Sequence, residues 1–306
     1  MTSDFEIDGP ELIPGLGARV SLNLADEISQ QARTTLRELL KQHHLLVFSG
    51  TDITLDQQME IARVFGRIVP TQAEPTLDLL ISNVREEGYL GSAELIWHTD
   101  HAYLREPLRV GLLYALDVQA GRSSTRFISA VRAVERLPCE LRQRLEYLQV
   151  LNTAEPGPQE NGGAIPLGQR VATLGSDLVA AAHPVISVHP NTGDRYLTPT
   201  PYHSDCILGM SGPESRAILD EIFGHFYVES EVYEHYWSNG DLVIWDNLAV
   251  HHSRGALENA GPRTLRRVSV GIGGFEEQIP ARLCGAWTSR SRAARERAMT
   301  ASGAKS

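Results

Sequence analysis

The sequence predicts an all-β core, a jelly roll or a related barrel, with helices appended to it. Amphipathic helical stretches stand early in the chain, and many short strand-like runs follow that are far apart in the sequence. The chain contains neither a GxGxxG fingerprint nor a phosphate-binding P-loop. A barrel therefore fits this order of elements better than a doubly wound parallel sheet.

The elements of the first part of the chain follow from periodicity and capping signals. Residues 26–42 place their apolar side chains on one helical face, and the apolar run 44–50 predicts a buried strand. Thr54 begins a second helix with a capping-box pattern, and Gly66 ends it. Residues 77–84 predict a further strand, so two helices flank the first strands.

The remainder of the chain is rich in predicted strands. An apolar strand is expected over 109–118, a helical stretch broken at Pro138 over 129–148, and a helix over 213–227. Proline and glycine clusters predict a long loop or lid over 152–182. The other strand-like runs are residues 183–188, 195–200, 241–246, 248–252 and 266–272.

The bulk properties favour a protein that acts on small molecules. The chain has 306 residues, and its formal net charge of −10 makes nucleic acid a poor partner. No apolar stretch is long enough to span a membrane, and the acidic N-terminus does not resemble a secretory signal. Three widely spaced cysteines, Cys139, Cys206 and Cys284, favour a reducing cytoplasm. We expect a small-molecule substrate and no membrane partner, and a homo-oligomer remains open.

The stretch IWHTDHAYL, residues 96–104, suggests a metal site. In an extended chain His98 and Asp100 point to the same side, and the residue between them points to the other. His-x-Asp alone is more often structural, so a third ligand is needed. His251 and His252 are neighbours that face opposite ways, so only one of them can join. Two histidines and one carboxylate form the facial triad of non-haem Fe(II) oxygenases.

Two arginines follow the histidine pair on a predicted strand. Arg263 and Arg267 are four residues apart, so they share one face of that strand. Surface salt bridges are one reading of this pair. The other is a carboxylate-bearing ligand, which a guanidinium binds through two parallel hydrogen bonds.

In combination, these motifs make the chain resemble the TauD/TfdA family of Fe(II)- and 2-oxoglutarate-dependent dioxygenases. The resemblance covers roughly residues 40–275. The segments that carry it are GSAELIWHTDHAYLREP, LLYALDVQAGRSSTRF, HPVISVHPNTG and GDLVIWDNLAVHHSRGALENAGPRTLRRVSVG. Each motif alone is weak evidence, and their combination is specific.

The resemblance implies which residues bind the metal and the co-substrate. Family spacing from Trp245 selects His252, so His98, Asp100 and His252 are the implied iron ligands and catalytic residues. The implied residues for the co-substrate 2-oxoglutarate are Thr125, Arg263 and Arg267. Arg263 and Thr125 would hold its distal carboxylate, and Arg267 would support its other end or the substrate. The turn before Thr125, GRSST, departs from the family's GGDT.

The resemblance also implies the fold and the reaction. We expect a double-stranded β-helix, a cupin-like jelly roll, in a single dioxygenase domain over 1–288, with a basic, flexible tail over 289–306. Fe(II), 2-oxoglutarate and O₂ would oxidise an unactivated C–H bond by hydroxylation or desaturation and release succinate and CO₂. Asn83 and Tyr103 are candidate substrate residues. The substrate could be an organic acid, an amino-acid derivative or a specialised-metabolite intermediate.

Two other hypotheses remain open from the sequence. A non-catalytic small-molecule binder could have kept the barrel without the chemistry, although an intact set of ligands argues against such decay. A zinc-dependent hydrolase could use the same histidines and aspartate. That second hypothesis leaves Thr125, Arg263 and Arg267 without a role.

Overall fold

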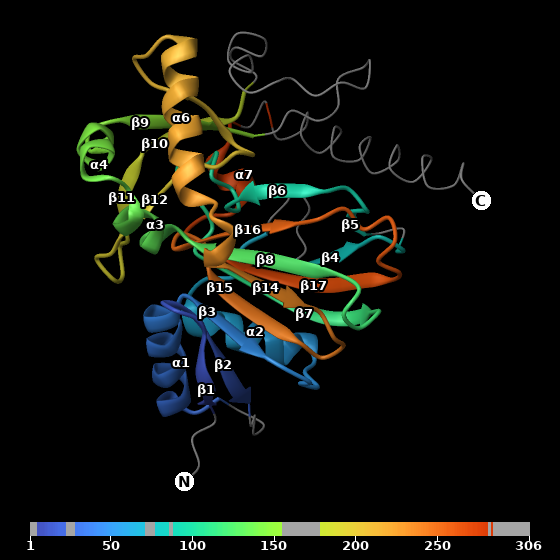
Figure 1. Ribbon diagram of the computed structural model, residues 1–306. Helices are drawn as coiled ribbons and strands as arrows, with labels where there is room; N and C mark the ends of the chain where they lie inside the picture. The colour runs from blue at the N-terminus through green and yellow to red at the C-terminus, as the bar shows by residue number, and fades with distance from the viewer. Residues whose placement is uncertain are drawn as a thin grey trace, which may run out of the picture.

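The computed structural model shows a β-rich protein with helices on its outside (Figure 1). The described residues are 5–22, 28–70, 77–85, 88–154, 178–280 and 283. The tail predicted over 289–306 lies outside the described residues, as does most of the loop predicted over 152–182.

Two mainly antiparallel sheets form the core. The larger has eight strands in the order β1-β2-β3-β15-β7-β17-β4-β5. Their bounds are Phe5–Ile13, Leu16–Leu22, Leu45–Phe48, Leu242–Asp246, Val110–Val118, Arg263–Val270, Asp78–Ser82 and Tyr89–Leu90. The smaller has four strands in the order β14-β8-β16-β6. Their bounds are Val232–Tyr236, Ser124–Ser129, Val250–Arg254 and Leu95–His98.

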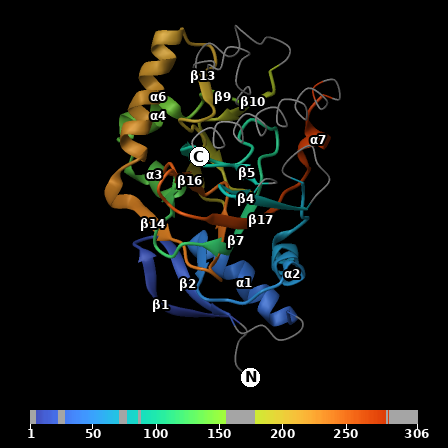
Figure 2. The same ribbon diagram turned by 90° about the vertical axis from the view of Figure 1, so that its right-hand side faces the viewer.

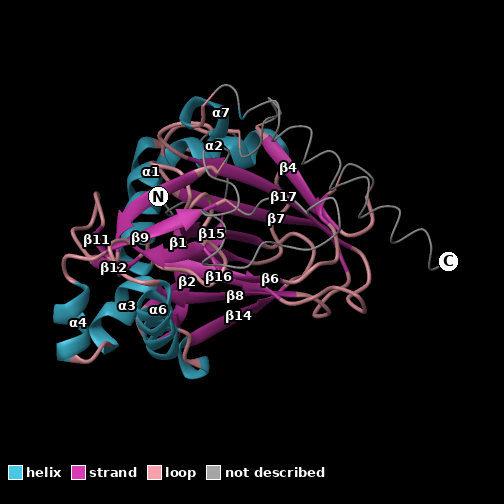
Figure 3. Ribbon diagram, turned by 90° about the horizontal axis from the view of Figure 1, so that it is seen from above, coloured by secondary structure: helices cyan, strands magenta, loops and turns pink. Residues whose placement is uncertain are grey.

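The two sheets face each other as the layers of a jelly roll, which confirms the predicted fold class (Figure 3). Alternation along β3 shows how the sequence builds both sides of the larger sheet. Leu45 and Val47 pack in the cluster between the sheets, which includes Phe127 from β8. Leu46 and Phe48 pack in the cluster beneath the helices. A strand that is buried on both faces reads as a continuous apolar run, as β3 does.

Two helices cover the outer face of the larger sheet. α1 spans Gln30–His43 and α2 spans Leu55–Phe65, close to the ranges predicted from periodicity (Figure 2). The capping box predicted at the start of α2 is present, because the Thr54 hydroxyl accepts a hydrogen bond from the Gln57 amide. The predicted end of that helix at Gly66 is also confirmed.

A second group of elements packs beside the smaller sheet. Its helices are α3 (Ala130–Arg136), α4 (Cys139–Leu145) and α6 (Gly212–Phe226), and η2 (Glu229–Glu231) is a short 3-10 turn. Its strands are β9 (Gln149–Thr153), β10 (Ala180–Pro184), β11 (Ile186–Val188), β12 (Arg195–Leu197) and β13 (Ser204–Ile207). The break predicted at Pro138 separates α3 from α4. The last described helix is α7 (Phe275–Gln278).

The N-terminal hairpin has no counterpart among the predicted elements. β1 and β2 pair with each other, and β2 extends the larger sheet by pairing in parallel with β3. Gly15 takes a φ of +73° at the turn between them, a conformation that glycine adopts without strain. The acidic residues along β1 obscure its strand character in the sequence.

Candidate metal centre and co-substrate pocket

The neighbouring strands β6 and β16 bring together the predicted metal ligands. His98 and His252 are directly paired across these antiparallel strands, so their side chains share one face. Their ring centroids are 4.1 Å apart. Asp100 follows β6, and its carboxylate lies 3.8 Å from His98 Nε2 and 3.6 Å from His252 Nε2. One ligand atom from each residue lies within 4.8 Å of the others, and all three side chains are buried.

The protonation states at this cluster suit a divalent cation. His98 Nδ1 lies 2.8 Å from the Ile96 carbonyl oxygen, which favours a proton on Nδ1 and a free lone pair on Nε2. Burial lowers the pKa of both His98 and His252, so both imidazoles are neutral at pH 7. Burial alone would raise the pKa of Asp100, but the Arg267 guanidinium holds it below its usual range. Two neutral imidazoles and one carboxylate match the donor set that Fe(II) accepts.

Asn247 fixes the backbone that carries Asp100. Its Oδ1 accepts a hydrogen bond from the Asp100 amide at 2.9 Å, and its Nδ2 donates to the Asp100 and Leu108 carbonyl oxygens. Asn247 is fully buried in the turn between β15 and β16. Sequence reasoning missed this residue, although it stands in the WDN segment that carries the resemblance.

Trp245 supports the third ligand from the larger sheet. Its ring centroid lies 4.9 Å from that of His252. A Cβ at Gly111 would lie 2.2 Å from the Trp245 ring, so glycine is required on the neighbouring strand β7. The Trp245 indole therefore packs between Gly111 of β7 and the ring of His252.

Arg263 projects into the barrel without a carboxylate partner among the described residues. It is 2% exposed, and its Nη2 donates to the Thr125 hydroxyl at 3.3 Å. The same hydroxyl accepts a hydrogen bond from Trp237 Nε1 at 3.0 Å. The Nε and Nη1 atoms of Arg263 are buried without a hydrogen-bond partner. Burial lowers the pKa of Arg263 to about 9. A buried guanidinium with unused donors fits the carboxylate of an incoming ligand.

Arg267 lies on the same strand and reaches the metal cluster. Its Nη2 forms an ion pair with Asp100 Oδ2, and its Nε donates to the Ser269 hydroxyl at 3.1 Å. A further buried arginine, Arg254, lies two residues beyond His252, and sequence reasoning missed it. Its unpaired Nε and Nη1 atoms are visible only in the structure.

The two candidate substrate residues have different surroundings. Asn83 accepts a hydrogen bond from the Arg263 amide and donates to the Gly261 carbonyl oxygen, both at 2.8 Å, so its side chain anchors the start of β17. Tyr103 packs its ring 5.1 Å from His203, whose own ring lies 6.4 Å from that of His98. Of the two, Tyr103 belongs to the aromatic wall beside the metal cluster.

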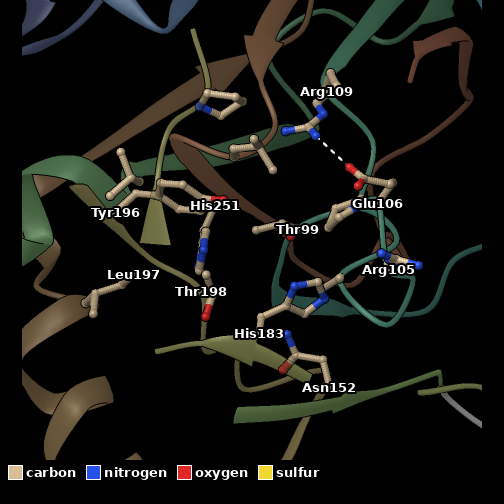
Figure 4. A pocket seen from close by; sticks show the side chains of 15 residues that line it. Thr99, Arg105, Glu106, Arg109, Asn152, His183, Tyr196, Leu197, Thr198 and His251 are labelled. Atoms are coloured by element: carbon tan, nitrogen blue, oxygen red, sulfur yellow. Dashed lines mark hydrogen bonds and ion pairs between the residues drawn. The ribbon is translucent and has the colours of Figure 1, made fainter. Parts of the chain in front are cut away.

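The residues next to the ligands face the other way, as alternation predicts. His251 Nδ1 lies 2.9 Å from the Tyr227 hydroxyl, and its ring packs at a tilt against Phe226 with the centroids 4.6 Å apart. Thr99 and His251 line a separate cavity of about 230 Å³ that Figure 4 shows. His98, Asp100 and His252 are not among the residues that line this cavity.

Among the described residues, no helix has the length and apolar character needed to cross a bilayer.

The comparisons with known proteins agree with this geometry. Residues 9–269 match the family described as "Taurine catabolism dioxygenase TauD, TfdA family". The chain is 30% identical over 280 residues to pentalenolactone F synthase of Streptomyces avermitilis, which covers 84% of this chain and 92% of that protein. It is 26% identical over 276 residues to the alpha-ketoglutarate-dependent 2,4-dichlorophenoxyacetate dioxygenase of Cupriavidus pinatubonensis, which covers 81% and 92%.

Solved structures share the fold at lower identity. A taurine dioxygenase from Burkholderia xenovorans matches with a TM-score of 0.72 and 21% identity, over 88% of this chain and 89% of that one. AAD-2 in complex with Mn(II) and N-oxalylglycine matches with a TM-score of 0.70 and 24% identity, over 87% and 97%. These likenesses confirm the jelly-roll fold.

Proposed function

The chain belongs to the TauD/TfdA family of dioxygenases, and from that premise we propose that His98, Asp100 and His252 bind its Fe(II). The observation that carries this proposal is the coincidence of two features in one barrel. Three buried ligand atoms lie within 4.8 Å of one another, and a buried guanidinium with unpaired donors lies beside Thr125. A zinc hydrolase would have no use for that guanidinium.

We propose that Arg263 and Thr125 bind the distal carboxylate of 2-oxoglutarate. When bound together with 2-oxoglutarate and O₂, Fe(II) would supply the chemistry that oxidises a C–H bond of the substrate. The 2-oxoglutarate would be converted to succinate and CO₂. The chain's own residues prepare the site. Arg267 pairs with one oxygen of Asp100 and keeps that group ionised, while burial keeps both histidines neutral and able to bind metal.

We propose that the substrate is a small organic acid with an apolar carbon skeleton. The wall beside the metal cluster is aromatic: the rings of Tyr202 and His203 lie 5.7 Å and 6.4 Å from that of His98, and Tyr103 packs 5.1 Å from His203. Several relatives are named for aryloxy acids, 2,4-dichlorophenoxyacetate and (S)-phenoxypropionate. An aromatic wall binds the carbon skeleton of such an acid.

The test is succinate formation from 2-oxoglutarate with Fe(II), O₂ and a panel of aryloxy and aliphatic acids. We expect succinate only when iron is present, and more succinate with the acids than with their methyl esters. His252→Ala should lose both turnover and Fe(II) binding, whereas His251→Asn should keep one bound iron because that side chain faces away. Full turnover in His252→Ala would overturn the ligand assignment. No 2-oxoglutarate turnover with any acid would favour a non-catalytic binder.

A further inference from the structure

Arg254 faces the same interior as the metal ligands and the co-substrate pocket. It lies on β16 two residues after His252, so both side chains are on one face of the strand. β16 pairs with β8 so that His252 is opposite Phe127 and Ser253 is opposite Arg126. Thr125 lies two residues before Phe127 on β8, so it is on the same face of the smaller sheet as His252 and Arg254.

The guanidinium of Arg254 is only partly used by the protein. Its Nη2 donates to the carbonyl oxygens of Leu90 and Ala93 and so holds the segment before β6. Its Nε and Nη1 atoms are buried without a hydrogen-bond partner, and the residue is 4% exposed. Among the described residues no carboxylate forms an ion pair with it. Anchoring this loop accounts for the hydrogen bonds of Nη2, but it gives Nε and Nη1 no role.

Arg254 and Arg263 are two buried cations of the same interior. Burial, and then the charge of Arg254, lower the pKa of Arg263, which contacts the Thr125 hydroxyl. Two buried like charges with unused donors are costly unless an anion lies between them. The hydroxyl that Arg263 already contacts marks the position of that anion.

We propose that Arg254 is a second cation of the pocket for the distal carboxylate of 2-oxoglutarate. The inference rests on the proposed function, and it adds a residue that positions the co-substrate from the smaller sheet while Arg263 binds it from the larger one. The pocket then selects a five-carbon dicarboxylate against a 2-oxo acid that ends in a methyl group. The pocket is expected to bind succinate as well, because succinate carries the same terminal carboxylate that Arg254 and Arg263 would contact.

The experiment measures binding of succinate and of 2-oxoglutarate to the metal-free protein by calorimetry, so that it does not depend on turnover. Arg254→Gln should raise both dissociation constants by about tenfold to a hundredfold, the loss expected for one charge-assisted contact. Arg254→Lys keeps the charge and should recover part of that affinity. Arg266→Gln is the matched control, because this buried arginine donates to Gln58 and Ile53 on the other side of the sheet. Its dissociation constants should equal those of the wild type.

Each outcome decides the matter. Unchanged dissociation constants in folded Arg254→Gln, with only a lower melting temperature, would show that Arg254 is a loop anchor and overturn the inference. If the wild type binds neither ligand, with or without Mn(II), the proposed function fails instead. If Arg254→Gln does not fold, Arg254→Met is measured in its place, and unchanged dissociation constants in that variant overturn the inference. An equal loss of affinity for 2-oxovalerate, which lacks the distal carboxylate, would also contradict the assignment.

Discussion

Replacing Arg263 by methionine should weaken co-substrate binding strongly without destabilising the metal-free protein. Most buried arginines contribute hydrogen bonds to the fold, but the Arg263 guanidinium makes one long hydrogen bond, to Thr125, lies 6.0 Å from the Trp237 ring and leaves Nε and Nη1 unpaired. Methionine fills a similar volume and removes a buried, unpaired charge. Replacement of such a charge by an apolar side chain is neutral or stabilising. The metal-free variant should therefore melt at or above the wild-type temperature.

The size of the binding loss follows from the contacts that Arg263 can make. A guanidinium that grips a carboxylate forms two charge-assisted hydrogen bonds, each worth about 1.5–3 kcal/mol. Loss of both costs about 3–6 kcal/mol, or about a hundredfold to ten-thousandfold in the dissociation constant. At a ligand concentration of about 100 times the wild-type dissociation constant, 2-oxoglutarate should stabilise the wild type by about 2.7 kcal/mol. In the variant that stabilisation should almost vanish.

Thermal denaturation with Mn(II), with and without 2-oxoglutarate, measures both effects in one assay. The control is Arg266→Met, since Arg266 is bonded to the Gln58 side chain and the Ile53 carbonyl oxygen. That variant should lose stability and keep its response to 2-oxoglutarate. If Arg263→Met loses several degrees without ligand, or still gains the full ligand-induced shift, the reasoning is refuted.

Three further predictions concern the residues around the metal cluster. Burial lowers the pKa of His251 to about 3. Below about pH 6.5 this imidazole therefore binds a proton in the unfolded chain but stays neutral in the folded protein. His251 should contribute about 1.4 kcal/mol per pH unit to the fall in stability from about pH 6 to pH 4, and His251→Gln should reduce the slope by that amount in urea titrations. Gly111→Ala should lower the melting temperature, because its Cβ would lie 2.2 Å from the Trp245 ring. Asn247→Leu leaves buried backbone groups at Asp100 unpaired and should cost about 3 kcal/mol or more in the free energy of unfolding, with weaker Mn(II) binding by calorimetry.

The sequence predicts the order of elements well where a local signal exists. The two early helices carry an apolar face or a capping box, and the strands β3, β7 and β15 are apolar runs buried in the larger sheet. The hairpin β1–β2 carries no such signal. Its stability comes from pairing with β3, a contact between residues that are distant in the sequence.

The candidate site shows the same limit. Alternation alone indicates that His98 and Asp100 share a side, and that His251 and His252 do not. The direct pairing of His98 with His252 is a matter of strand register and cannot be read from spacing. Asn247 is another example, because its three hydrogen bonds join segments almost 150 residues apart in the sequence and its amide could equally well have capped a turn.

Strand β16 connects the proposed metal site with the proposed co-substrate pocket. Its odd and even positions face opposite sides, so His252 and Arg254 enter the barrel while His251 packs against Tyr227 outside it. Two residues of a strand span about 7 Å, which separates a metal ligand from a cation by roughly the length of a five-carbon dicarboxylate. A shift of the register by one residue would move both groups out of the barrel together. The register of this strand, more than any single side chain, therefore determines whether metal and co-substrate can bind side by side.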